Sequence, residues 1–497
     1  MHVQPPGSVE PHVVGGCRRN HRLERCRGST ASGEAGVSAD MAEPSAADPR
    51  LRADPLADDT IDRILGETAG TPLLPRWEAV ALVEDALASW TTNAALDGWT
   101  AAEGTPLPIA AALEHYVRQA RQLPAWADSG KIGCAEAVFA EIGLLSPTLL
   151  ACAVLPEADV AVDPLAQSLD ERLRAAMVLQ CAVLLQGGLL DPAGAGLAQL
   201  LKTRLTNALI RHLIVRGNPA EALAHGAAIH PLLPEGPQRY RVLFAQGWNV
   251  RANGLPRNQQ EQAYALLSCH YVFLRSLRRL GLGLNKQEEG AWLHAWNVAG
   301  HLLGIEEALQ SATMKDAATQ FARLQHKAQA SAAARYAAPA RKGAAPAYGK
   351  IADPRPALGA SLMHALQDEI GTRSRKAVPI LLARRLCGPA TTRILGLDGR
   401  VSMRSRALFA LGMAAARVVP GLSAGRLAGR ILGYRLAQRY MLDPAHPLEL
   451  PEVLLRQVDA AVRDWDSDAQ APRWVRAIER RFRPQPAKGG TGAAAAC

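Results

Sequence analysis

Two histidines and an asparagine are spaced to share one face of a predicted helix. His294, Asn297 and His301 lie three and four residues apart in the segment KQEEGAWLHAWNVAGHLL, with tryptophans between them. Residues at this spacing stack on one side of a helix, so both imidazoles would face one pocket. They are about two turns, or roughly 10 Å, apart, which is too far for this pair alone to chelate a metal ion. The pattern favours histidines packed beside aromatic rings over a metal site.

A second candidate is GLSAG at 421–425, which matches the Gly-x-Ser-x-Gly pattern of serine hydrolases. That chemistry requires a strand, a sharp turn and a helix that together lift the serine hydroxyl. The preceding residues, RALFALGMAAARVVP, instead predict a helix that ends at Pro420. We therefore interpret Ser423 as part of a helix start and not as a nucleophile.

The elements that must position these residues are helices. Apolar residues recur at intervals of three and four and no window alternates with a period of two, so we predict an all-α fold. Asn258 followed by Glu261 predicts one helix start, and Gly281 predicts its end. Asn285 followed by Glu288 repeats the device for the helix that carries His294 and ends at Gly304.

We predict three regions along the chain. Residues 1–50 are rich in Gly, Ser, Arg and Glu without periodicity, which indicates a disordered extension in which Met41 is an alternative start to Met1. Residues 51–440 form a single large multi-helix domain, with a mobile loop at 328–350 where Ala, Pro and basic residues replace an apolar stripe. Residues 441–497 supply a C-terminal helix and a disordered tail.

Charge and cysteine content bear on the partners and the compartment. The formal charge is +10, and residues 400–440 contain eight Arg and no acidic residue, which makes this stretch a candidate membrane-surface contact. Its later arginines point around the helix, so we expect no nucleic-acid partner. The eight cysteines form no CxxC pair, and the N-terminus has no apolar signal region. These features predict a cytoplasmic protein, with peripheral membrane contact as a further option.

Several segments together resemble one family, the MpaB-type oxygenases that include rubber oxygenase (latex clearing protein). The resemblance covers roughly residues 120–400 and is carried by the order of these motifs: LPAWADSGKIGCAEAVFAEIGLLSPTLLACAVLP, GLPRNQQEQAYALLSCHYVFLRSLRRLGLGL, GAWLHAWNVAGHLLGI and VPILLARRLCGPATTRILGL. It implies an all-α fold around a haem b whose iron is held by one histidine, with O2 bound on the open side. It further implies oxidative cleavage of carbon–carbon double bonds in an isoprenoid or another hydrophobic substrate.

The resemblance also shows two departures at the implied haem site. The family carries its histidine in a Val-Arg-Leu-Met-His-Ala helix, and the matching residues TRLTNA place Asn207 where the ligand should be. An amide oxygen is a weak neutral donor beside an imidazole. The family's distal Arg and Thr match ERLRAAM, which keeps Arg172 but places Ala176 at the threonine.

Three hypotheses follow from these departures. In the first, haem is held by a displaced ligand, for which His294, His301, His270 and His230 are candidates. Arg172 then supplies the distal electrostatic contact, Glu157 acts as a general base, and the helices that end near Leu280 and Leu303 line a tunnel for the substrate. In the second, a haem-free relative holds a lipid or isoprenoid. In the third, the protein is a partner-binding scaffold. The identity of any iron ligand stays open at this point.

Overall fold

The structure is a computed structural model of the whole chain. It describes residues 48–68, 71–161, 169–218, 238–246, 248, 250, 254–337, 351–368, 377–418, 434–442 and 448–467. These residues all belong to one compact unit, Pro44–Cys497. Ser423, His230, most of the predicted N-terminal extension and the predicted tail lie outside the described residues.

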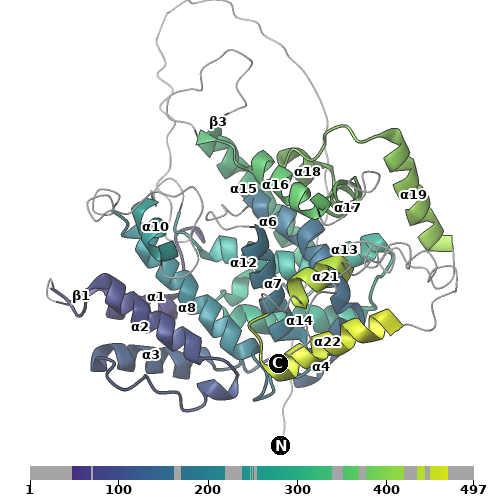
Figure 1. Cartoon of the computed structure of the whole chain (residues 1–497). Helices are drawn as coiled ribbons and strands as arrows, with labels where there is room; N and C mark the ends of the chain where they lie inside the picture. Colours follow the sequence, from purple (N-terminus) through teal and green to yellow (C-terminus); the bar gives the residue numbers. More distant parts are fainter. Residues whose placement is uncertain are drawn as a thin grey trace, which may run out of the picture. The chain divides into compact units, whose positions relative to one another are not determined.

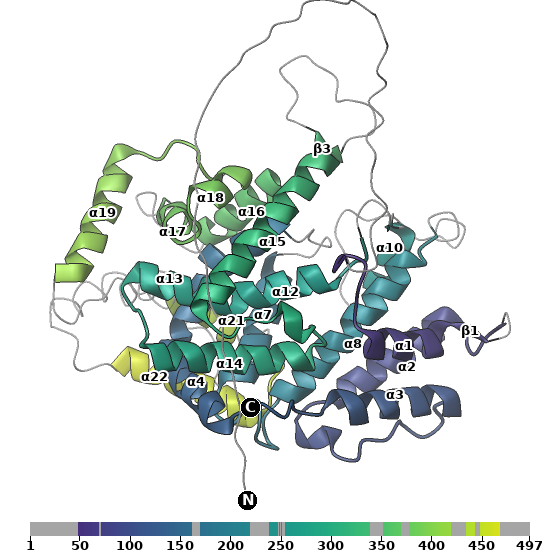
Figure 2. The same cartoon turned by 180° about the vertical axis from the view of Figure 1, so that it is seen from behind.

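The first helices form a group at one side of the unit (Figures 1 and 2). They are α1 (Pro55–Leu65), α2 (Arg76–Ser89), the short η1 (Ala94–Leu96) and α3 (Leu107–Ala120). Strands β1 (Glu67–Thr68) and β2 (Thr71–Pro72) make a two-residue antiparallel pairing between α1 and α2. The predicted extension is too long by a few residues, because the Arg50 carbonyl accepts a hydrogen bond from the Leu255 amide at 2.9 Å.

A central set of helices follows, and it carries most of the predicted site residues. Its elements are α4 (Ser129–Ile142), η2 (Gly143–Leu145), α5 (Ser146–Leu149), the π-helical turn η3 (Leu150–Val154), α6 (Leu155–Ala161), α7 (Leu169–Leu184), α8 (Gly196–Val215) and α10 (Gln238–Gln246). Helix α8 contacts α1, α7, α10 and α14, so it lies in the interior of the bundle.

The next helices begin and end where the sequence predicted. They are α12 (Gln259–Leu267), a second π-helical turn η4 (Ser268–Val272), α13 (Phe273–Leu280) and α14 (Lys286–Leu302). The Asn258 side chain accepts from the Glu261 amide at 3.0 Å, and Asn285 forms a complete capping box with Glu288. Gly281 ends α13 in the left-handed region, at φ 79°, where a side chain would be strained. Local capping chemistry therefore determines these boundaries.

The remaining elements correct the predicted loop and the predicted domain boundary. They are η5 (Glu307–Leu309), α15 (Met314–Arg335), the parallel pair β3 (Tyr336–Ala337) and β4 (Ile351–Ala352), α16 (Arg355–Asp368), α17 (Val378–Cys387), α18 (Pro389–Ile394), α19 (Met403–Val418), α21 (Tyr434–Met441) and α22 (Glu452–Ser467). The loop predicted at 328–350 is wrong for 328–335, which continue α15 because alanine is the best helix former. Helix α22 buries Leu454 and Val458 in the common core, so residue 440 is not a domain boundary.

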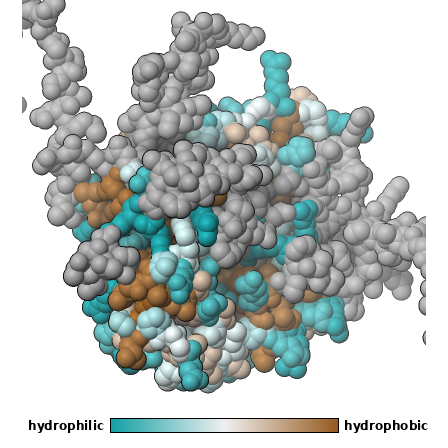
Figure 3. Space-filling view, turned by 60° about the vertical axis from the view of Figure 1, so that its left-hand side comes forward, coloured by the Kyte–Doolittle hydropathy of each residue, from teal (hydrophilic) through white to brown (hydrophobic). Residues whose placement is uncertain are grey.

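The all-α prediction is confirmed, since each described strand is only two residues long. The core is one cluster that contains large buried rings, among them Phe273 stacked on Trp292 with ring centroids 4.7 Å apart. Within the described residues, no single helix is both long and apolar enough to cross a membrane; α4 together with Ser146–Val160 would pass, but the two are bent by 89°. On the face visible in Figure 3, apolar residues form separate patches with hydrophilic residues between them.

Candidate functional site

Helix α8, which carries Asn207, is attached to α1 by charged pairs. Asp54, the residue that precedes α1, and Asp58 and Asp62 within the helix lie four residues apart and therefore face the same side. Asp54 Oδ1 accepts from Arg204 Nη2 at 2.8 Å, and Asp58 Oδ1 accepts from Arg211 Nε at 2.9 Å. The third aspartate, Asp62, lies 2.8 Å from Nδ1 of His212. These pairs fix the rotation of α8 about its own axis.

Asn207 itself is half-buried, and among the described residues its side chain has no hydrogen-bond partner. The chain thus places a neutral amide, without a hydrogen-bond partner among the described residues, at the position where the resemblance expects an iron ligand. An amide oxygen at this position gives iron a much weaker donor than an imidazole would.

Arg172 lies near the start of α7, and its charge is already paired. Its guanidinium makes a salt bridge with Asp159 of α6, whose side chain is only 2% exposed. Burial raises the pKa of Asp159, and the nearby Arg172 opposes that rise. One turn further along the helix, Ala176 is half-buried against the core and offers no hydroxyl. Arg172 therefore serves first to compensate a buried carboxylate.

Glu157 is completely buried on α6, and its carboxylate contacts three donors from distant parts of the chain. Oε1 accepts from Arg275 at 2.6 Å, while Oε2 accepts from the Thr391 hydroxyl at 2.8 Å and from Gln325 Nε2 at 3.0 Å. Burial raises the pKa of Glu157, whereas Arg275 and Thr391 oppose the rise. A raised pKa is what a general base requires, but both oxygens are already engaged.

His270 has the opposite surroundings. It lies in the π turn η4, is completely buried, and neither of its ring nitrogens has a hydrogen-bond partner. Burial lowers its pKa to about 3, so the ring is neutral at physiological pH. Among the described histidines it is the one that is fully buried. A neutral imidazole with a free lone pair is the form that binds a metal.

The two π turns bring these groups into one neighbourhood. Turn η4 contacts both η3 and α6, and the Tyr264 hydroxyl on α12 donates to the Glu157 backbone carbonyl at 3.1 Å. A π turn inside an α-helix costs hydrogen-bond geometry and is found frequently at functional sites. The sequence pattern predicted neither turn.

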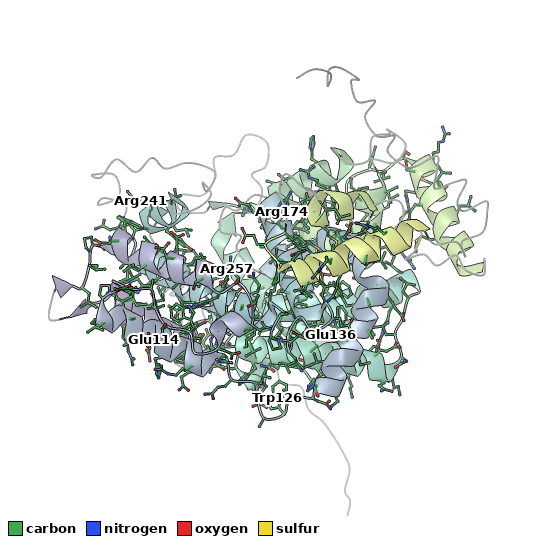
Figure 4. The ribbon with its side chains drawn as sticks, turned by 60° about the horizontal axis from the view of Figure 1, so that its bottom comes forward. Glu114, Trp126, Glu136, Arg174, Arg241 and Arg257 are labelled. Atoms are coloured by element: carbon green, nitrogen blue, oxygen red, sulfur yellow. The ribbon has the colours of Figure 1, made fainter. Side chains whose placement is uncertain are left out.

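His294 and His301 lie elsewhere, at the edge of the molecule. His294 Nε2 accepts from the Asp128 amide at 2.9 Å, and both imidazoles pack edge-on against Trp126. Figure 4 shows Trp126 at the margin of the molecule. Beside it is a cavity of about 760 Å³ between α4 and α14, lined by His294, Asn297 and Lys131 among others. The predicted shared face is confirmed in that both rings meet Trp126, although His301 does not line the cavity.

One of the candidate iron ligands has ring nitrogens without a hydrogen-bond partner among the described residues. No described group of three or more His, Cys, Asp and Glu could hold a bare metal ion, but a haem requires a single protein ligand. Asn207 offers a weak donor and His294 already uses Nε2, whereas both nitrogens of His270 lack partners. His270 is therefore the candidate whose two ring nitrogens are both unengaged, and it does not line the cavity beside Trp126. The sequence indicates a buried helix here, because YALLSCHYVFL is apolar around most of the helix, but it does not distinguish His270 from the other candidate ligands.

The described residues form an all-helical domain, and comparison with known proteins identifies its family. Residues 169–418 match the family described as ER-bound oxygenase mpaB/B'/Rubber oxygenase, catalytic domain, so the chain belongs to this oxygenase family. A rubber oxygenase of Streptomyces sp. (strain K30) is 24% identical over 240 residues, which are 46% of this chain and 52% of that protein. The chain thus matches about half the length of this curated relative. A structure of latex clearing protein in the closed state aligns with a TM-score of 0.48 and 19% identity, covering 84% of this chain and 91% of that one.

Proposed function

We propose that this protein is a haem b-dependent oxygenase for a hydrophobic, isoprenoid-like substrate, and that His270 holds the iron in place of the residue at position 207. The observation that carries the proposal is the pair of unpartnered ring nitrogens of a fully buried, neutral histidine. A buried polar group without a hydrogen bond costs free energy, so its presence in the core requires an explanation. Binding to a cofactor iron supplies one.

When bound, haem would supply the oxygen chemistry; the reaction that the resemblance implies balances without a further reductant. One O2 adds to one carbon–carbon double bond, the bond breaks, and each carbon leaves as a carbonyl that carries one oxygen atom. The chain's own residues exclude water and place charge. Arg172 supplies a fixed cation, and Glu157 is the candidate proton acceptor once one of its donors moves away.

The decisive experiment is an absorption spectrum from 350 to 700 nm of the full chain expressed with a haem precursor. We expect a Soret band in the unaltered protein, its loss in His270→Ala, and its retention in His294→Ala and His301→Ala. His326→Ala, at an exposed histidine on α15, is the matched control for loss of an imidazole. A full Soret band in His270→Ala with native stability would refute the assignment of the ligand.

A haem-free relative that holds a lipid or isoprenoid is the second candidate, and Asn207 is the observation that favours it. If the unaltered protein shows no Soret band but Asn207→His acquires one, the pocket persists and the usual ligand has been lost. Organic extraction of the purified protein, followed by mass spectrometry, should then recover a co-purified apolar molecule. Absence of both haem and lipid would leave the scaffold hypothesis.

A further inference from the structure

Helix α19 exposes more large apolar surface than any other described helix. Of the ten large hydrophobic residues that are exposed, three lie on it: Met403 is 74% exposed, Leu408 54% and Leu411 67%. No other described helix carries more than one of the ten. Figures 1 and 2 both show α19 at an edge of the described helices, and it contacts α17. A soluble helix in this position ordinarily presents polar residues to water.

The residues of α19 divide into two apolar faces. Phe409 and Met413 are partly buried and pack against the core. At 100° per residue, the centre of a second face lies roughly 130° from that of Phe409 and Met413. It contains Met403, Ala407, Ala410, Leu411 and Ala414, and all five are exposed. The exposed Leu408 lies beyond Leu411, roughly 60° further round. The inner face explains how the helix is attached to the domain. Packing within the described residues leaves the outer face uncovered.

Two arginines border this outer stripe. Arg404 falls about 60° from Ala407 on one side, between Leu411 and the exposed Leu408. Arg406 falls about 100° from Ala407 on the other side, next to the inner-face Met413. Both side chains are exposed, and residues 399–418 contain no acidic residue. Arginine at the border of an apolar stripe can extend its guanidinium to phosphate while its methylenes stay in the apolar layer. Apolar residues flanked by arginines are the pattern of a helix that lies in a membrane interface.

We propose that the outer face of α19 docks on an anionic lipid surface, with Met403 and Leu411 in the acyl boundary and Arg404 and Arg406 on the headgroup phosphates. A second copy of this chain is a poorer occupant, because a face-to-face dimer would bring like-charged arginines together. Nucleic acid also fits poorly, because its charged phosphate backbone would leave the central stripe of Met, Ala and Leu without an apolar partner. The proposal does not depend on haem. Docking through α19 would hold the protein in one orientation on the membrane from which a hydrophobic substrate would come.

The test is flotation of the full-length protein with vesicles of neutral phosphatidylcholine, alone or with roughly 30% phosphatidylserine. We expect binding to the anionic vesicles, a loss of at least about tenfold in partitioning for Met403→Asn/Leu411→Asn, and about 30-fold for Arg404→Gln/Arg406→Gln at low salt. Leu107→Asn is the matched control, because Leu107 on α3 is 84% exposed but lies on a different helix; it should bind like the unaltered protein.

Each alternative result overturns the proposal in a distinct way. Equal binding to neutral and anionic vesicles would remove the role of the arginines, and unchanged binding in the asparagine double variant would remove insertion of the stripe. Concentration-dependent dimers in sedimentation, abolished by Leu411→Asn, would make a second copy the occupant. All substituted positions are exposed, so circular dichroism should show native folding in every variant.

Discussion

Glu157 and His270 are both completely buried in neighbouring elements, yet their surroundings are opposite. Glu157 has a partner for each oxygen, drawn from α13, α15 and α18, whereas His270 has none. A saturated buried group holds helices together and is hard to free for chemistry. An unsaturated one costs stability and is available to a ligand. The difference indicates a mainly structural task for the carboxylate and supports the proposed ligand task for the imidazole.

The largest expected effect is on the saturated side of this comparison. Arg275→Met leaves Glu157 buried without its cation, and breaking a buried pair costs about 3–5 kcal/mol of unfolding free energy. The double variant Glu157→Gln/Arg275→Met should regain most of that loss, because no charge is then stranded. Urea unfolding of the three proteins measures it. If Arg275→Met is as stable as the unaltered chain, the network does not hold the core together.

The second effect is on the unsaturated side and depends on pH. His270 has a folded pKa of about 3, below the unfolded value of 6.5. The stability that depends on keeping it neutral is therefore present above about pH 6.5 and lost as the pH falls toward 3. Without haem, the chain should lose about 3 kcal/mol more than His270→Leu between pH 7 and pH 4. Parallel pH curves for the two proteins would contradict the buried position of the ring.

Glu157 should respond in the opposite direction. Its folded pKa is raised, so its contribution is present below the unfolded value near 4.5 and is lost as the pH rises through the folded value. As the pH rises, the unaltered chain should therefore lose unfolding free energy relative to Glu157→Gln. Thermal melts at several pH values measure this shift, and an opposite slope would show that Arg275 outweighs burial.

A smaller effect is expected at Arg172. Arg172→Ala should lower oxygenase turnover by about tenfold while haem content changes little, because the guanidinium places charge and does not hold iron. The substitution also strands the buried Asp159, so Arg172→Ala/Asp159→Asn is the control that separates loss of charge from loss of folding. Unchanged turnover in both variants would remove Arg172 from the reaction.

The smallest effect should be at Asn207. Because the residue is half-buried and its side chain has no hydrogen-bond partner within the part of the chain that the structure describes, Asn207→Ala should change the unfolding free energy by no more than about 0.5 kcal/mol. The Soret absorbance should also stay within error of the unaltered protein. A marked loss of haem in this variant would indicate that residue 207 holds the iron and would contradict the ligand task proposed for His270.

Helix boundaries could be predicted wherever the signal is local. The Asn258 and Asn285 caps and the Gly281 stop each depend on a few adjacent residues, and all three are present in the structure. The end of α15 was missed because composition suggested a loop, whereas alanines favour continuing a helix that is already nucleated. The π turns could not be foreseen, since they depend on packing between distant segments.

The candidate site was predicted only in part, for a related reason. Spacing selects residues on one helical face, and it singled out His294 and His301, which lie at the rim. Burial depends on which helices surround a residue. His270 is distinguished from the other candidates by its burial, which follows from the packing of η4 against α6 and η3. The partners of Glu157 lie 118 to 234 residues away along the chain, beyond the reach of any local pattern.

The three aspartates of α1 also bear on how the domain can be divided. The segment that matches the oxygenase family begins at residue 169, whereas Asp54, Asp58 and Asp62 precede it by more than a hundred residues. A fragment cut at that boundary would contain α8 with Arg204 and Arg211 but without their counter-charges. The segment that matches the family is therefore shorter than the segment that contains both partners of these charged pairs. Met1 and Met41 both precede the three aspartates, so a chain that starts at either residue contains all of them.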